Sequence, residues 1–315
     1  MIRTAVVLGH LGRVIVIVGV AMVSCLIWSL EGGEAAAGAL AVSALVTVGS
    51  GLALVYGFPV REGINFREGF VLVSLGWVLA SLFGTLPFVL SGYLPSFADA
   101  WFETVSGFTT TGASVVADVE SWPKGLMFWR CLTQWLGGMG IIALFVAIIA
   151  GIGVRANQLF KAEVPGPVSE KISPRIRETA RRLWLVYVAL SAVCAALLYL
   201  LGMDAFDALC HTFTTMATGG FSTKNASIGF YRDPLIQWTI TLFMFLAGAN
   251  FALHFLALKQ KSLGAYWRNA EFRLYAGITA VGALLVAWDL HCSGAVPGLE
   301  PLLRAALFQV VSVAT

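Results

Sequence analysis

Charged residues are scarce in this sequence of 315 residues, and their scarcity excludes an ordinary soluble domain. Asp, Glu, Lys and Arg make up 12% of the chain, whereas 58% of it is hydrophobic and the mean hydropathy is +0.84. Soluble globular domains carry about 25% charged residues. The apolar runs are about 20 residues long, a length typical of membrane-spanning helices rather than barrel strands. We therefore expect an all-α polytopic membrane protein in a lipid bilayer.

Cysteine motifs and clustered polar ligands are also missing. The five cysteines are scattered without a CxxC motif, which argues against a disulfide framework or a metal site. The predicted spans carry almost no acidic residues and no nucleophile–base pair, so an intramembrane enzyme is not expected. The net charge of +3 is small. We expect no bound cofactor and no nucleic-acid partner.

The apolar segments fall into two length classes. The long runs are residues 14–30, 36–56, 69–91, 126–150, 183–202, 235–258 and 271–289. The first of them is long for a signal peptide and has a poor cleavage context, so we interpret it as a retained span. The short runs, at residues 97–108, 204–216 and 299–313, cannot cross a bilayer as helices. Their length is typical of re-entrant segments or core helices.

The basic residues predict which loops face the cytoplasm. If the N-terminus is cytoplasmic, each long run crosses once and each short run dips and returns, then 15 of the 20 basic residues lie inside. These are Arg3, Arg13, Arg61, Arg67, Arg155, Lys161, Lys171, Arg175, Arg177, Arg181, Arg182, Lys259, Lys261, Arg268 and Arg273. Full crossings by the short runs would break this asymmetry. The positive-inside rule therefore favours re-entrant segments and a cytoplasmic N-terminus.

An internal repeat becomes visible when Gly112 is placed over Gly220. The stretch "DAWFETVSGFTTTGAS" (99–114) then lies over "DALCHTFTTMATGGFS" (207–222), and each follows a long run and precedes another. The final stretch, "AALFQVVSVAT" (305–315), starts the same pattern, with Thr315 over Thr109 and Ala217. We expect helix–pore loop–helix units, two complete and a third partial, in which the chain stops inside the third loop.

The residue types of these loops suit a pore that binds a dehydrated cation. Backbone carbonyls can replace the hydration shell of potassium, threonine favours extended dihedrals and adds a hydroxyl, and glycine lets a carbonyl turn where a Cβ would clash. Non-helical backbone is tolerated at membrane depth only where protein or water covers it. The candidate potassium filter residues are Thr109, Thr110, Thr111, Gly112, Ala217, Thr218, Gly219 and Gly220.

The acids of the short helices have structural as well as functional interpretations. Asp99 and Asp207 stand three residues after Ser96 and Asp204, which is the spacing of a capping box. A helix capped in this way would aim its negative C-terminal end at the middle of the membrane. For Glu103 we consider a second role, concentration of cations at the pore mouth.

Other polar positions are expected to be structural. Arg130 should snorkel or pair with the carbonyl end of a pore helix, with an ion-facing role as the alternative. His211 and His254 lack a second ligand at metal spacing. "GGMG" (137–140) and "AGAN" (247–250) are interpreted as close helix packing rather than phosphate loops, and Asn250 as a donor or acceptor between helices.

Five stretches together resemble the Trk/Ktr/HKT superfamily of potassium transporters, and within it the bacterial Trk membrane subunit. They are "SGFTTTGAS" (106–114), "WRCLTQWLGGMGII" (129–142), "TTMATGGFST" (214–223), "FLAGANFALHF" (245–255) and "NAEFRLY" (269–275). The resemblance implies a potassium-uptake protein with four repeats around one pore, preceded by an extra helix pair. The filter glycines map onto Gly112 and Gly220, where glycine favours potassium and serine goes with sodium in some plant relatives.

The resemblance also assigns domains and partners. The extra helix pair is residues 1–60, the first repeat 61–152, a cytoplasmic linker 153–182, the second repeat 183–262, and the start of the third repeat 263–315. The family implies a homodimer in the bacterial inner membrane and a cytoplasmic nucleotide-binding regulatory subunit. Because the rest of the third repeat and the fourth repeat are not in the sequence, we expect a truncated product. The alternatives are a non-conducting fragment and a transporter of sodium or another monovalent cation.

Overall fold

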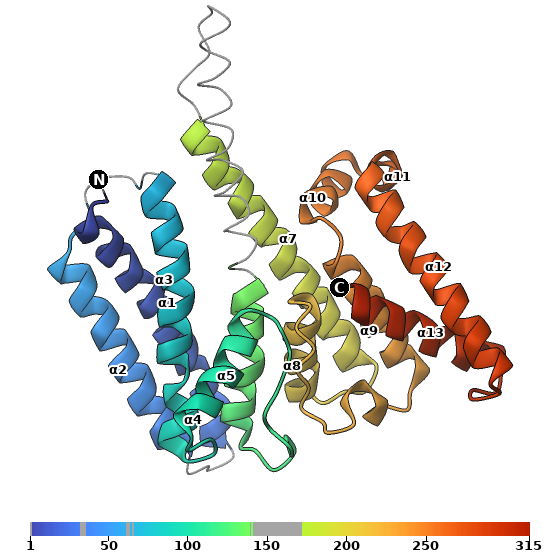
Figure 1. Cartoon of the computed structure of the whole chain (residues 1–315), viewed down its shortest axis with the longest axis horizontal. Coiled ribbons are helices and arrows are strands. Elements are labelled where there is room, and N and C mark those ends of the chain that lie inside the picture. The colour runs from blue at the N-terminus through green and yellow to red at the C-terminus, as the bar shows by residue number, and fades with distance from the viewer. Residues whose placement is uncertain (1, 32–35, 61–63, 65, 139, 141–171) are drawn as a thin grey trace, which may run out of the picture. The chain divides into compact units, whose positions relative to one another are not determined.

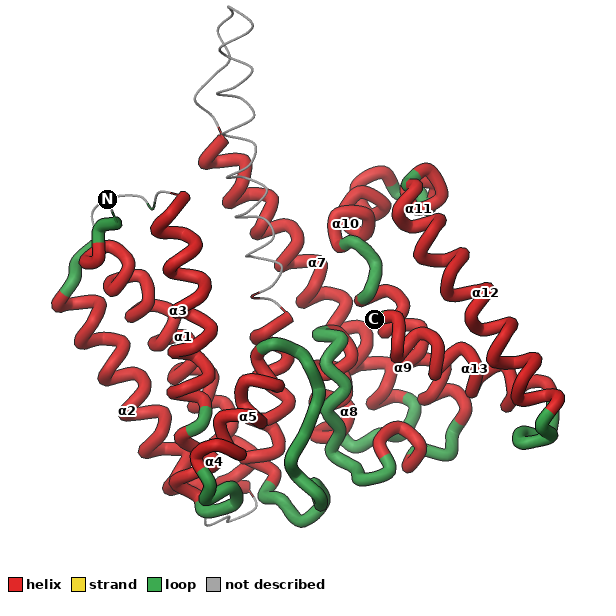
Figure 2. Tube along the Cα trace, viewed as in Figure 1, coloured by secondary structure: helices red, strands yellow, loops and turns green. Residues whose placement is uncertain are grey.

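The computed structural model describes residues 2–31, 36–60, 64, 66–138, 140 and 172–315. The described residues form helices and loops without a strand (Figures 1 and 2). The chain divides into two compact units, Met1–Ala180 and Arg181–Thr315, and each is described by itself. The boundary between them falls inside the predicted linker 153–182, of which residues 153–171 lie outside the described part of the chain.

In the first unit, three long helices pack side by side (Figure 1). They are α1 (Thr4–Glu31), α2 (Ala36–Gly57) and α3 (Phe66–Gly84). Buried apolar side chains such as Leu11, Met22 and Leu40 fill the contact between α1 and α2. A bidentate ion pair between Arg3 and the fully buried Glu68 joins α1 to α3, with nitrogen–oxygen distances of 2.8 and 2.7 Å.

The predicted span 69–91 is interrupted once. Helix α3 ends at Gly84, and α4 (Leu86–Ser91) begins after Thr85, with Pro87 in its first turn. Short helix α5 (Phe97–Phe108) follows, and residues 124–138 form the next helix. The predicted span 126–150 is thus helical up to residue 138, and its end at 141–150 lies outside the described residues.

The second unit repeats this order. Long helix α7 (Ile172–Leu200), which belongs to this unit from Arg181 onward, is followed by short helix α8 (Ala205–Met216) and the 3-10 turn η1 (Ser227–Phe230). Helices α9 (Pro234–Ala247), α10 (Phe251–Gln260) and α11 (Gly264–Arg268) come next. Helix α12 (Ala270–Cys292) then leads into short helix α13 (Leu299–Ala314), which packs against α12 and α9.

Length and apolar composition identify five described helical segments that could cross a membrane. They are Thr4–Leu30, Ala36–Gly57, Arg67–Ser91, Ala180–Leu200 and Ala270–Cys292, with mean hydropathy between 1.4 and 2.3. The predicted span 235–258 is not a single straight helix, because α9 and α10 are bent by 98° at Gly248–Asn250. The three predicted short segments are short helices, as expected.

Candidate functional site

Each candidate loop begins where a capped short helix ends. Ser96 caps α5 by accepting the Asp99 amide at 3.4 Å, and Asp204 caps α8 by accepting the Asp207 amide at 2.7 Å. The helices end at Phe108 and Met216, so the filter segments Thr109–Gly112 and Ala217–Gly220 both lie outside them. Each short helix of 12 residues is roughly 18 Å long, about half a bilayer.

The two loops, residues 109–116 and 217–224, have matching backbone conformations. Thr109 and Ala217 share a φ of −82°, with ψ of 0° and −4°. Thr110 and Thr218 have φ of 55° and 52°, and Gly112 and Gly220 both have φ of 78°. Positions that correspond in the sequence repeat thus agree to within a few degrees. The repeat predicted from residue identity is therefore a repeat of structure.

Hydrogen bonds close both helix ends in the same register. In the first loop, Thr110 and Thr111 donate their amides to Gly107 and Ser106 at 2.9 Å each. In the second, Thr218 and Gly219 donate to Thr215 and Thr214, at 3.0 and 2.8 Å. These bonds satisfy carbonyls that a helix end leaves without partners.

The expectation of extended threonines is wrong for Thr110 and Thr218. Their positive φ is a conformation that β-branched residues rarely adopt, and such strain persists only where the surroundings hold it. At Gly220 a Cβ would meet no atom of the surrounding structure within 4 Å, so the expected clash is with the backbone of the loop itself. The left-handed φ, and not lack of space, is what requires glycine at this position.

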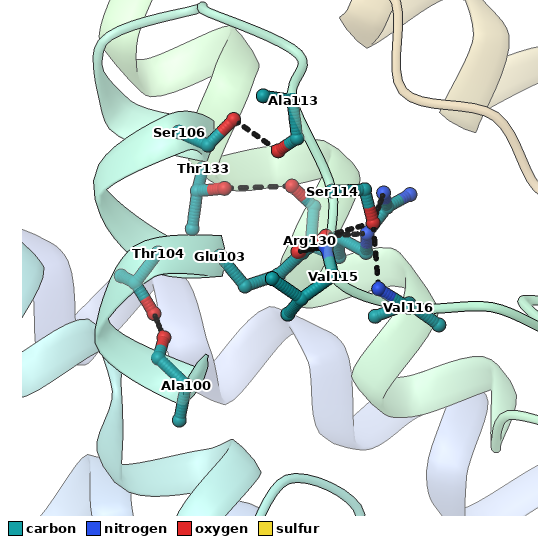
Figure 3. Close-up of polar contacts among 10 residues, drawn as sticks. All are labelled: Ala100, Glu103, Thr104, Ser106, Ala113, Ser114, Val115, Val116, Arg130 and Thr133. Carbon is teal, nitrogen blue, oxygen red and sulfur yellow. Dashed lines mark hydrogen bonds and ion pairs between the residues drawn. The ribbon is translucent and has the colours of Figure 1, made fainter. Parts of the chain in front are cut away.

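A buried ion pair holds the first loop against its helix (Figure 3). Arg130, on the helix of residues 124–138, donates to Glu103 on α5 at 2.6 Å, and both side chains are at most 3% exposed. Glu103 also accepts from the Ser114 hydroxyl at 2.9 Å and the Val115 amide at 3.0 Å. The loop therefore returns alongside α5, as Figure 2 also shows. Burial contradicts the mouth role considered for Glu103, and Arg130 pairs with the Glu103 carboxylate.

Different residues hold the second loop, and they do so one turn nearer the start of its short helix. Asp207, expected to be only a cap, is buried and accepts from the Thr223 and Tyr231 hydroxyls at 2.7 and 2.6 Å. The Lys224 ammonium lies 3.0 Å from the same carboxylate and 4.9 Å from the Phe230 ring centroid. These contacts link the first turn of α8 to the outgoing limb of the loop.

Corresponding positions also carry equivalent contacts with different chemistry. His211 occupies the place of Glu103, and Ser222 that of Ser114. The His211 Nε2 lies 3.1 Å from the Ser222 hydroxyl, and its Nδ1 lies 2.9 Å from the Asp207 carbonyl. Both His211 and His254 are hydrogen-bonded within the protein. Among the described residues, no group of three or more His, Cys, Asp or Glu side chains could hold a metal ion.

A third copy begins at the end of the sequence. Thr315 donates its amide and its hydroxyl to Val311, at 3.1 and 2.9 Å. Thr109 makes the same pair of bonds to Val105, at 2.8 and 2.7 Å. Other helical threonines, such as Thr104 and Thr241, make the same hydroxyl bond four residues back, so the register of the third copy stays a prediction.

Close packing of glycines against the ends of the short helices agrees with the interpretation of "GGMG" and "AGAN". A Cβ on Gly137 would lie 2.1 Å from the Phe108 carbonyl oxygen. A Cβ on Gly248 would lie 2.5 Å from Cγ2 of Thr315 and 2.7 Å from the Tyr275 hydroxyl. No side chain fits at either place without movement of the neighbouring short helix or ring.

The break between α9 and α10 is stabilised by side chains that sequence reasoning did not connect. The Tyr275 hydroxyl donates to the Phe245 carbonyl at 3.1 Å, and His254 Nε2 lies 2.8 Å from the Leu246 carbonyl. Both carbonyls lie in the last turn of α9, where the regular intrahelical bonds end, and the Leu246 carbonyl also accepts from the Ala249 amide at 3.1 Å. Asn250 caps α10 through the Ala252 amide at 3.0 Å, so the interhelical role expected for it is wrong.

Long apolar helices and repeated helix–loop–helix units define a polytopic helical membrane protein. The TrkH family, described as "Cation transport protein", matches residues 47–285. The TrkH potassium uptake protein of Escherichia coli K12 is 44% identical over 254 residues, which are 80% of this chain and 53% of that protein. The TrkH protein of Halomonas elongata is 38% identical over 310 residues, 97% of this chain and 64% of that protein.

The fold agrees with these sequence relationships. The crystal structure of the potassium transporter TrkH from Vibrio parahaemolyticus matches 99% of this chain and 64% of its own, with a TM-score of 0.88 and 32% identity. The chain belongs to the TrkH family of cation transport proteins. It spans about half to two thirds of the length of these relatives.

Proposed function

We propose that this chain takes up potassium across the bacterial cytoplasmic membrane, as the membrane-spanning subunit of a Trk-type transporter. One observation carries the proposal. Two loops of different sequence, Thr109–Gly112 and Ala217–Gly220, have the same alternation of negative and positive φ. Loops built alike at the ends of half-span helices suit main-chain coordination of one type of ion. The relatives named above are potassium uptake proteins.

The helix ends add a favourable electrostatic term for a cation. Helices α5 and α8 are capped at their N-termini by Ser96 and Asp204, so their partly negative ends adjoin the two loops. Glu103 and Asp207 are paired with Arg130 and Lys224. Their charges are therefore balanced, and they position the loops rather than attract ions.

The proposal includes the arrangement around the loops. Residues 61–152 and 183–262 form the first two repeats of one pore, residues 263–315 start the third, and residues 1–60 are the additional helix pair. The N-terminus and residues 153–182 are cytoplasmic, where a nucleotide-binding regulatory subunit binds. The transporter is a homodimer. The charge asymmetry and the family membership support these assignments.

Complementation tests the proposal. Residues 1–315 replace the matching part of the E. coli relative, and the chimaera is expressed in a strain that lacks potassium uptake systems. Growth at low potassium is expected, and Gly112→Ser and Gly220→Ser should lose the preference for potassium over sodium in uptake assays. Absence of rescue by a chimaera that reaches the membrane would refute the proposal. Rescue that depends on sodium would favour the alternative of a sodium-linked member of the family.

A further inference from the structure

The segment that follows the helix break, α10–α11 (residues 251–268), carries basic residues without acidic partners. Lys259, Lys261 and Arg268 are exposed, and so is Arg273 in the next helix. None of the four forms an ion pair with a residue that the structure describes. Residues 251–273 contain a single acid, Glu271. The segment is thus strongly positive for its length.

Large apolar side chains stand exposed among these charges. Leu258, Leu263 and Trp267 are 66%, 72% and 63% exposed. The segment itself is well anchored, because the Tyr266 hydroxyl lies 2.6 Å from His254 Nδ1 and the Tyr266 ring packs 4.9 Å from that of Phe272. Exposure of these side chains is therefore a property of a folded surface, not of a frayed end.

Helix α12 places this segment at the membrane surface. With 23 residues, most of them apolar, α12 is roughly 34 Å long, which is enough to cross a bilayer once. Helix α11 ends at Arg268, immediately before the Asn269 cap of α12. Helices α10 and α11 therefore lie near the N-terminal end of α12 (Figure 1). Tryptophan and leucine beside lysine and arginine at this depth are typical of segments that lie in the headgroup region.

We propose that the α10–α11 segment binds anionic phospholipid headgroups. Lys259, Lys261 and Arg268 contact the phosphates, while Leu258, Leu263 and Trp267 enter the boundary between headgroups and acyl chains. A basic surface next to an anionic leaflet gains affinity with each lysine or arginine. The exposed leucines favour lipid as the occupant over an acidic protein surface. A lipid supplies an anionic phosphate for the basic side chains and acyl chains for the apolar ones. The site is independent of the ion that the transporter carries.

Fluorescence quenching of Trp267 tests the proposal on the purified chain in vesicles. Phosphatidylcholine vesicles contain dibrominated phosphatidylglycerol or dibrominated phosphatidylcholine at the same mole fraction, and a Trp267→Phe variant provides the signal of the other tryptophans. Phosphatidylglycerol is expected to quench Trp267 more strongly, and less so at high salt. Lys261→Gln alone should raise the half-saturating mole fraction roughly fivefold, and K259Q/K261Q/R268Q should abolish the difference between the two lipids.

A matched variant separates this site from general charge effects. R13Q/R67Q/R232Q removes the same charge at exposed positions outside residues 251–268 and should keep the lipid preference. Equal quenching by both lipids in the unaltered chain would overturn the proposal. A preference that survives K259Q/K261Q/R268Q, or is lost in the matched variant, would also overturn it. Equal quenching with photo-crosslinking from position 267 to the regulatory subunit would show that the segment binds protein instead.

Discussion

At Gly220 the backbone conformation, not the available space, resists substitution. Its φ is 78°, yet a Cβ there would contact nothing within 4 Å. Gly220→Ala should therefore leave the fold intact and cost about 1–2 kcal/mol of local strain, relieved if the loop changes shape. We expect a large loss of potassium flux through the chimaera, measured as rubidium uptake, at normal membrane yield.

Gly76→Ala is the control for this substitution. Gly76 lies in α3, and a Cβ there also meets no atom within 4 Å. Alanine in a helix interior is better than glycine by about 1 kcal/mol. Flux should be unchanged in this variant. Normal flux in Gly220→Ala would show that the left-handed conformation is not needed for conduction.

The Glu103–Arg130 pair is buried, so the loss of either partner alone is predicted to be strongly destabilising. Removing one partner leaves an uncompensated charge, at a cost of about 3–5 kcal/mol. Glu103→Gln should lower the thermal unfolding temperature in detergent sharply, whereas Glu103→Gln with Arg130→Met should recover part of the loss. The partly exposed pair Arg304–Glu300 is the comparison, and Arg304→Gln should cost less than about 1 kcal/mol. Equal effects of the two single changes would contradict the burial argument.

At the scale of secondary structure elements, the bend between α9 and α10 depends on side chains that reach the end of α9 from α10 and α12. His254→Phe removes one partner of the Leu246 carbonyl, which keeps the Ala249 amide, and the His254 partner of the Tyr266 hydroxyl. Each lost bond should cost about 0.5–1.5 kcal/mol. A lower unfolding temperature in detergent is expected. His291→Phe, at an exposed position on α12, should be neutral. No difference between the two variants would show that the carbonyls find other partners.

Hydropathy and repeat register were sufficient to predict most elements. The short helices at 97–108, 204–216 and 299–313 and the cap residues Ser96 and Asp204 follow from run length and capping spacing. The bend at Gly248 does not, because the apolar run continues through it and the groups that stabilise it, Tyr275 and His254, are distant or lack a local signal. Hydropathy averaged over a window measures composition and carries no information on whether the helix axis bends.

The candidate loops were located from the sequence, but their support was not. Threonine and glycine types identify the positions, whereas the contact of Glu103 with Arg130 joins residues 27 apart on two helices. The contact of Asp207 with Tyr231 is similar, at a separation of 24 residues. Single-sequence reasoning supplies no distance for such pairs. The available signal was an acidic residue inside a short apolar segment. It suggested a helix cap, or a charge that concentrates cations at the pore mouth.

At the scale of the whole molecule, the membrane topology is the property most directly testable. Alkaline phosphatase fused after residue 121 should be active, because the loop between α5 and the next helix is predicted to face outward. Fusion after residue 261 should be inactive, because the basic α10–α11 segment is predicted to face the cytoplasm. Activity in the reverse order would invert the proposed orientation. A fluorescent protein fused at the same sites gives the complementary signal.

The agreement between loops 109–116 and 217–224 has a consequence for how such proteins diverge. Threonine and alanine occupy the first position with the same torsions, and a carboxylate and an imidazole occupy the position that reaches the returning limb. Duplicated segments can thus lose most of their shared residue identities and keep the same backbone conformation. Ancestry among such copies is better measured by dihedral angles than by amino-acid identity.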